Sequence, residues 1–191
     1  MPSPPWLVVI GGPNGAGKTT FARSAAARLS LRYLGADQMA ERDGLGDSGP
    51  AAFRAGRLFT RALDAAVSRQ ESLLVEATLA GTGLSRLMRR ARDSGYSVSI
   101  KFVFVDSVET CIARIRGRVQ TGGHFVPDDD VRRRFRRSLF NFWERYRHEA
   151  DDWHLTYNGS SGAVEVAFGD GSGAVVVDRG RFEHFVGLME A

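Results

Sequence analysis

The sequence predicts a single α/β domain of three layers, built on a mostly parallel sheet with a hairpin near the C-terminus. Three observations predict this class. Strand-like apolar segments alternate with segments of helical periodicity, which is typical of a parallel sheet wrapped by helices. The 191 residues allow one domain, 1–191, with a sizeable core. The balance of 43% hydrophobic and 25% charged residues is that of a soluble globular protein.

The first half of the chain predicts strands and helices in alternation. Apolar residues at helical spacing follow Lys18, and glycines with a proline mark the loop that comes later. The expected elements are strands at 6–10, 31–34 and 72–81, helices at 18–29 and about 51–69, and a loop at 41–50.

The second half continues the alternation and then changes to strands. Its expected elements are helices at 83–94, 107–119 and 128–150, and strands at 96–106, 153–158 and 163–178. Gly169 to Gly173 can turn a hairpin inside the last segment. In the helix at 128–150 we expect Phe135, Phe140, Phe142 and Trp143 to face the core.

Composition limits the classes of function. The net charge is +4, and because only Lys18 and Lys101 are lysines, arginine supplies 24 of the 26 basic residues. The planar guanidinium suits phosphate, but codon bias explains the same excess. The single cysteine, Cys111, excludes an internal disulfide and fits a cytoplasmic protein. No apolar run approaches a membrane span, and no secretion signal is visible.

Residues 11–20 carry the strongest motif. The segment G-x-x-x-x-G-K-[ST] lies between a predicted strand and a predicted helix, which argues against a coincidental glycine turn. Backbone N–H groups of such a loop hold phosphates, Lys18 spans the β- and γ-phosphates, and the Thr19 hydroxyl can bind Mg²⁺. The predicted ATP-binding residues of this loop are Gly12, Pro13, Asn14, Gly15, Ala16, Gly17, Lys18, Thr19 and Thr20.

Two signatures of other nucleotide-binding classes are missing from the sequence. There is no Asn-Lys-x-Asp segment, which reads guanine in small GTPases, and no LSGGQ-like segment, which marks transport ATPases. We therefore expect ATP as the nucleotide and a compact phosphotransferase as the class of enzyme.

Three acids follow predicted strands, where functional groups of open α/β sheets gather. Asp37 is the candidate base that accepts the proton of an acceptor hydroxyl, with a helix N-cap as the alternative. Glu76, with Thr78 nearby, is expected to bind the acceptor or the water shell of the metal, unless it is a solvated strand end. For Asp106 we expect a structural role as a helix cap.

The segment at about 114–137 has the character of a lid. Arg114 and Arg118 lie four residues apart on one helix face, before a glycine loop that contains His124. Arginines beside such a loop can bind ATP and neutralise charge on the transferred phosphoryl group. We expect most of the arginines at 132–137 to form a solvated face, and His124 is either a surface residue or a phosphate contact.

Together these stretches resemble the zeta toxin family of P-loop kinases. The resemblance rests on "GGPNGAGKTTFAR", "LGADQMA", "LLVEATLAG", "GGHFVPDDDVRRRFRRSLFNF" and "WHLTYNGS". It implies a sheet of order 2-3-1-4-5 and ATP-dependent phosphorylation of a small hydroxylated acceptor, which in the characterised toxins is UDP-N-acetylglucosamine. The family typically pairs with a small helical antitoxin.

The resemblance also implies roles for individual residues. Asp37 falls at the base position, and Glu76 with Thr78 at the strand end that binds the acceptor. Arg118 and Arg134 match the arginines that clamp phosphate. The lid departs from the family, because an arginine is expected near His124, and this weakens the sugar-nucleotide assignment more than the kinase assignment.

Two other functions remain open from the sequence. A nucleic-acid 5′-hydroxyl kinase or binder is favoured by the isoelectric point of about 9.7 and the arginines at 132–137. It is disfavoured because exposed aromatic residues are not interleaved with them. The second alternative is a nucleotide-regulated interaction module that transfers nothing.

Overall fold

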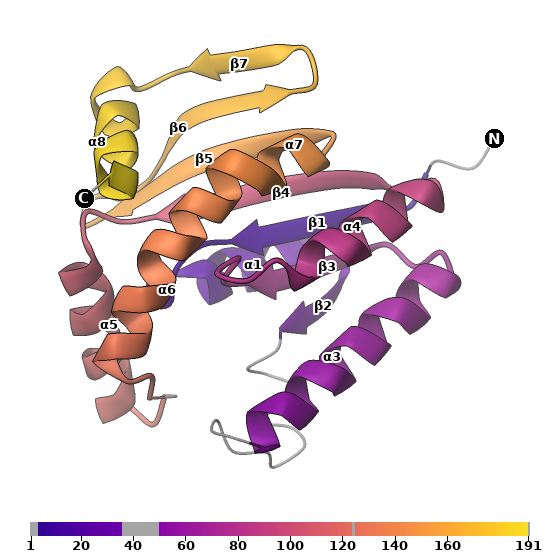
Figure 1. Cartoon of the computed structure of the whole chain (residues 1–191), viewed down its shortest axis with the longest axis horizontal. Coiled ribbons are helices and arrows are strands. Elements are labelled where there is room, and N and C mark those ends of the chain that lie inside the picture. The colour runs from indigo at the N-terminus through magenta and orange to yellow at the C-terminus, as the bar shows by residue number, and fades with distance from the viewer. Residues whose placement is uncertain (1–3, 36–49, 124, 191) are drawn as a thin grey trace.

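The computed structural model describes residues 4–35, 50–123 and 125–190. Within these ranges seven strands form one sheet in the order β2-β3-β1-β4-β5-β6-β7 (Figure 1). The strands are β1 (Trp6–Gly11), β2 (Arg32–Gly35), β3 (Leu73–Ala77), β4 (Ser97–Phe104), β5 (Asp152–Gly159), β6 (Gly162–Asp170) and β7 (Gly173–Val176). Strands β1 to β5 pair in parallel, which confirms the order 2-3-1-4-5, and β6 and β7 add the C-terminal antiparallel hairpin.

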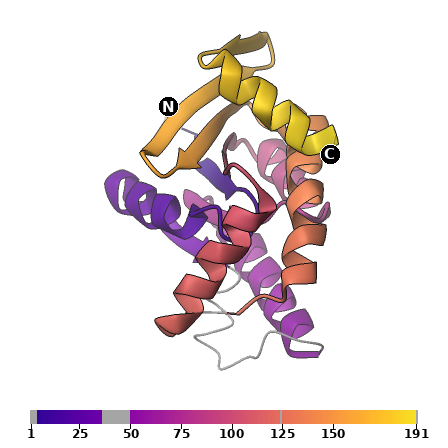
Figure 2. The same ribbon diagram turned by 90° about the vertical axis from the view of Figure 1, so that its left-hand side faces the viewer.

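Helices cover both faces of the sheet, which gives the three layers predicted. Helix α1 lies on one face, whereas α3, α4 and α6 lie on the other (Figures 1 and 2). The helical elements are α1 (Lys18–Leu29), α3 (Pro50–Ser68), α4 (Gly83–Asp93), α5 (Val108–Gln120), α6 (Asp128–Asn141), the π-helix η1 (Phe142–Tyr146), α7 (Arg147–Glu149) and α8 (Arg179–Glu190).

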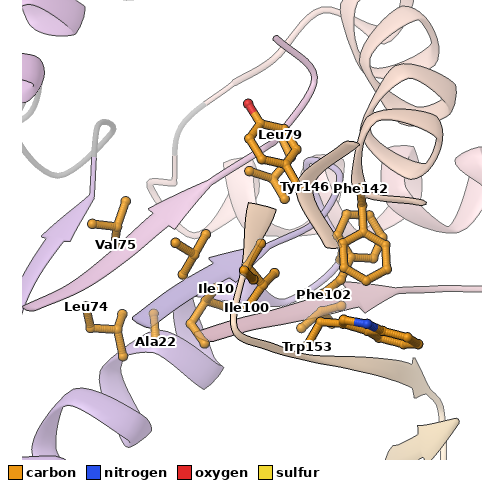
Figure 3. Packing of buried hydrophobic residues seen from close by; sticks show 14 of the residues in the cluster. Ile10, Ala22, Leu74, Val75, Leu79, Ile100, Phe102, Phe142, Tyr146 and Trp153 are labelled. Carbon is orange, nitrogen blue, oxygen red and sulfur yellow. The ribbon is translucent and has the colours of Figure 1, made fainter. Parts of the chain in front are cut away.

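The core lies on both faces of the sheet, and its aromatic part lies between the sheet and the helices that follow β4. Phe102 of β4 stacks on Phe142, with ring centroids 4.3 Å apart, and Trp153 of β5 meets the same ring edge-on (Figure 3). On the other face, Ala22 and Ala26 let α1 approach the sheet closely, because alanine side chains are short. The apolar centres of β1, β3 and β4 are therefore buried on both sides, as expected for parallel strands.

The structure corrects the sequence analysis at several places. The helix expected at 128–150 is interrupted by a π-helix, and Phe140 is 57% exposed instead of facing the core. Helix α8 was not predicted, although Phe182 and Phe185 show helical spacing and pack on the core. Of the expected loop at 41–50, residues 41–49 lie outside the described residues, and Pro50 is the first residue of α3.

Candidate active site

The phosphate loop connects β1 to α1, as predicted. Gly12, Gly15 and Gly17 have φ angles of 141°, 82° and 95°, which L side chains rarely adopt. A Cβ atom on Gly12 would overlap the backbone of Val103, and one on Gly15 would overlap the backbone of Cys111. These glycines therefore let the loop wrap closely against β4 and α5, at the N-terminus of α1.

Inside the loop the remaining side chains are packed tightly. Lys18 is only 7% exposed, and its Nζ donates to the Pro13 carbonyl at 2.9 Å. The Ala16 N–H also bonds to this carbonyl, at 3.2 Å. Asn14 is buried, and its Oδ1 has no hydrogen-bond partner among the described residues, whereas Thr20 is exposed. The Lys18 ammonium is thus held across the loop in which a phosphate group would lie.

The carboxylate of Glu76 joins the phosphate loop to two strands. Its Oε1 accepts from the Thr19 hydroxyl at 2.9 Å, and its Oε2 accepts from the Tyr33 hydroxyl at 2.5 Å. This contact arises because parallel pairing aligns Glu76 of β3 with Ile10 of β1 and Gly35 of β2, at the carboxyl edge of the sheet. The half-buried hydroxyl and carboxylate are hard oxygen ligands of the kind Mg²⁺ prefers.

A second pair of residues supports the opposite side of the loop. Asn158, at the end of β5, donates from Nδ2 to the Ala16 carbonyl at 2.8 Å. Arg114 of α5 donates from Nη2 to the Asn158 carbonyl at 2.9 Å. The structure therefore brings the predicted Arg114 to the phosphate loop through Asn158, a residue that sequence reasoning did not select. Its place in "LTYNGS", at the carboxyl end of an expected strand, was the available signal.

The two arginines expected to clamp phosphate lie on separate helices that pack together, α5 and α6. Arg118 is exposed near the end of α5, and its side chain lies against Gly123. Arg134 is half-buried and pairs with Asp130 at 3.0 Å. Asp130 also accepts from Arg133, and this hydrogen bond holds the pKa of its carboxyl below the ordinary value. Among the described residues, no hydrogen bond or ion pair connects Arg134 to the phosphate loop.

The loop after β3 is held by side chains that the sequence analysis missed. Thr78, a predicted acceptor contact, is half-buried, and its carbonyl accepts from the Ser138 hydroxyl. Asn141 and Tyr146 donate to later carbonyls of the same loop. Their partners lie 60 to 65 residues away in the sequence, so no local pattern identifies them.

Asp106 does not cap the following helix, contrary to the expectation. Ser107 is the N-cap of α5, since its hydroxyl accepts from the Thr110 N–H at 3.2 Å. The Asp106 carboxylate instead accepts from the Tyr157 hydroxyl, and this bond raises the pKa of the tyrosine. The Asp106 carbonyl also contacts His184 of α8, at 2.9 Å. Asp106 thus joins β4, β5 and α8.

Two predicted site residues, Asp37 and His124, lie outside the described residues. Cys111 lies under the phosphate loop with no exposed surface, and burial raises the pKa of its thiol to about 12. The thiol is therefore protonated at neutral pH and is no candidate nucleophile.

The glycine loop, Lys18 and Thr19 at the start of α1, and a strand-end carboxylate on β3 define a P-loop nucleotide-binding domain with a kinase-like arrangement. A family model described as AAA domain (AAA_33) matches residues 7–142. Because the match covers more than half of the chain, the chain belongs to this family.

Other proteins resemble this chain in sequence or in fold. A protein of Haemophilus influenzae is 30% identical over 124 residues, which are 65% of this chain and 88% of the relative. A chain from the PezAT chromosomal toxin-antitoxin system of Streptococcus pneumoniae superposes with a TM-score of 0.66 at 15% identity, covering 100% of this chain and 80% of that one. A chain from the structure of AvrRxo1-ORF1:-ORF2 with ATP superposes with a TM-score of 0.74 at 16% identity, covering 97% of this chain and 63% of that one.

The structural likeness shows the fold, and zeta toxin membership stays a prediction.

Among the described residues, none of the helices is long and apolar enough to cross a membrane.

Proposed function

We propose that the chain is an ATP- and Mg²⁺-dependent kinase that phosphorylates a hydroxyl group of a small molecule. The observation that carries the proposal is the contact of Glu76 with Thr19 beside the glycine loop. This places an ordered hydroxyl and a carboxylate at the end of the loop where the β- and γ-phosphates would lie. Such a pair suits a catalytic divalent cation bound together with the nucleotide.

Thr19 and Glu76 would hold the Mg²⁺, Thr19 through its hydroxyl and Glu76 through its carboxylate or an intervening water. When bound, the cation neutralises charge on the transferred phosphoryl group. Lys18 is already within the loop and would exchange the Pro13 carbonyl for phosphate oxygens. Its ammonium then stabilises the charge that moves toward the bridging oxygen during transfer.

The arginines of α5 and α6 would supply further positive charge to the bound nucleotide. Arg114 is fixed by the Asn158 carbonyl and lies on the same helix as Arg118, one turn earlier. Arg134 would exchange Asp130 for phosphate when a nucleotide or acceptor is bound, which costs little because the ion pair is half-exposed. These residues are proposed to bind the ATP and the transferred group, and Asp37 to accept the proton of the acceptor hydroxyl.

The acceptor that we propose is a small molecule such as a sugar nucleotide, in line with the zeta toxin resemblance. That resemblance, together with the similarity to a chain of a toxin-antitoxin system, supports an antitoxin as a protein partner. Nucleic acid is disfavoured as the substrate, because three of the five arginines at 132–137 are paired with acids. These are Arg132 with Glu109, and Arg133 and Arg134 with Asp130.

The test is phosphoryl transfer from ATP to a panel of hydroxylated acceptors, measured as acceptor-dependent release of ADP. Asp37→Ala should abolish acceptor-dependent turnover while ATP still binds, because the base touches the acceptor and not the phosphate loop. A wild-type rate of transfer in this variant would show that Asp37 is not the base. Binding without any transfer by the wild-type protein would favour a nucleotide-regulated interaction module instead.

A further inference from the structure

Three side chains on α6 and η1 hold the loop that leaves β3, residues 78–82. The Ser138 hydroxyl donates to the Thr78 carbonyl, Asn141 Nδ2 donates to the Leu79 carbonyl at 2.9 Å, and the Tyr146 hydroxyl donates to the Gly81 carbonyl at 2.7 Å. We call Ser138, Asn141 and Tyr146 the loop clamp. Its members lie 60 to 65 residues away from their partners in the sequence.

The π-helix η1 makes this set of contacts possible. In an uninterrupted α-helix the face of Ser138 and Asn141 would continue at Arg145. The wider π-turn adds one residue, so Tyr146 takes this place. The outcome is visible in the burial, since Tyr146 is 0% exposed whereas Arg145 is exposed. π-Helical turns are often found at functional sites, which is a reason to ask what this one positions.

The clamped loop has an unusual backbone at its second residue. Leu79 has a φ of 58°, in the left-handed region that a leucine seldom adopts. Its side chain is buried against Gly11, where a Cβ atom would overlap it. Figure 3 labels both Leu79 and Tyr146 among the buried residues of the core. The surrounding contacts therefore hold this conformation in place.

The loop fixes the direction in which the chain leaves β3, immediately after Glu76. Strand β3 ends at Ala77, which pairs with Gly11 of β1, and the first clamped carbonyl belongs to Thr78. Glu76 lies two residues before that carbonyl and touches Thr19. Displacement of the loop therefore changes the position of the Glu76 carboxylate relative to the phosphate loop.

We infer that the loop clamp consists of positioning residues, which hold Glu76 against Thr19 and so organise the cation end of the nucleotide site. The inference rests on the proposed function, because it assigns Glu76 to the divalent cation. Among the described residues, no hydrogen bond joins Ser138, Asn141 or Tyr146 to the phosphate loop, and we infer that they act through the backbone of residues 78–82. Through Ser138 and Asn141, helix α6, which carries Arg134, is also fixed to the loop that follows the strand of Glu76.

The test measures the affinity of a fluorescent ATP analogue in EDTA and across a MgCl₂ titration, for the wild type, Ser138→Ala, Tyr146→Phe and the double variant. Affinity in EDTA should stay within about twofold of the wild type, because the backbone N–H groups and Lys18 still hold the phosphates. The gain in affinity given by Mg²⁺ should fall about fivefold in each single variant and at least about tenfold in the double variant, as expected for lost hydrogen bonds.

Arg145→Ala is the matched control, since it changes the same π-helix on its exposed side and should keep the full gain from Mg²⁺. Thermal melting identifies the variants that remain folded. Tyr146→Phe should be among them, because it removes only one buried hydroxyl. A wild-type gain from Mg²⁺ in the folded double variant overturns the inference, as does an equal loss of affinity in EDTA. If the wild-type protein itself gains nothing from Mg²⁺, the proposed metal site fails, and that result is distinct from failure of the clamp.

Discussion

Substitution of Lys18 by alanine separates the chemistry of the phosphate loop from its contribution to stability. Lys18 is 7% exposed, and its ammonium donates to the Pro13 carbonyl. A charge-assisted hydrogen bond contributes about 1.5–3 kcal/mol, but the removal of an ammonium from water costs several kcal/mol. These terms offset each other, so we expect Lys18→Ala to change the free energy of unfolding by no more than about 1 kcal/mol, or roughly 2–4 °C in melting temperature.

The effect on turnover is much larger. The interaction of the Lys18 ammonium with the phosphate oxygens strengthens as charge moves to the bridging oxygen. Loss of this side chain should therefore remove roughly 3 kcal/mol or more of transition-state stabilisation, which is about 100-fold in rate. Nucleotide affinity should fall less, since the backbone N–H groups of the loop remain. The arginines do not substitute, because none of them lies at the start of α1.

Steady-state ADP release, ATP binding and thermal melting of Lys18→Ala together test this reasoning. The control is Lys101→Ala, which removes the other lysine of the chain; its Nζ lies 5.8 Å from the centroid of the Phe21 ring. Lys101→Ala should keep wild-type turnover. Unimpaired turnover in Lys18→Ala would refute the assignment of the phosphate loop, and a loss of stability as large as the loss of activity would refute the separation.

Three further predictions use the same site. Glu76→Gln keeps the size of the side chain but removes its charge and one acceptor. The MgCl₂ concentration for half-maximal ATP turnover should therefore rise by about tenfold or more. An unchanged MgCl₂ midpoint would show that Glu76 does not hold the metal. Asn158→Asp replaces the donor to the Ala16 carbonyl with a carboxylate, and it should weaken ATP binding about tenfold by calorimetry, whereas equal affinity would show that this contact is dispensable. Burial raises the pKa of the Cys111 thiol from 9.0 to about 12, so the unfolded state loses its proton first and stability falls as the pH rises through this window. The free energy of unfolding should drop by about 1 kcal/mol between pH 9 and 10 from this group, a slope that Cys111→Ala should lack in denaturant titrations.

The fold was predictable because its signals are local and repeated. The glycine loop between an apolar strand and a periodic helix fixed the place of β1 and α1, and the alternation that follows predicts the parallel sheet. Helix α8 was missed because the strand signals just before it dominated the interpretation, although Phe182 and Phe185 were in register. The π-helix left no signal in the sequence, because it depends on the fit of Tyr146 to a distant carbonyl.

The candidate site was predictable only in part, for a physical reason. Lys18 and Thr19 belong to one motif, so their neighbourhood follows from sequence spacing. The contact between Thr19 and Glu76 spans 57 residues and depends on strand order, which composition and periodicity do not encode. For the same reason Asn158 and the loop clamp were found only in the structure, since each joins segments that are remote in the sequence.

Phosphoryl transfer itself is the most direct test of the central claim. The full chain would be incubated with ATP, MgCl₂ and a small-molecule extract of cells, and the products compared by mass spectrometry with those of Lys18→Ala. We expect a hydroxylated metabolite to gain one phosphoryl group as ADP forms in equal amount, in the wild-type reaction alone. If the two reactions yield the same small molecules and the same background of ADP, the chain does not act as a small-molecule kinase under these conditions, and the central claim is contradicted.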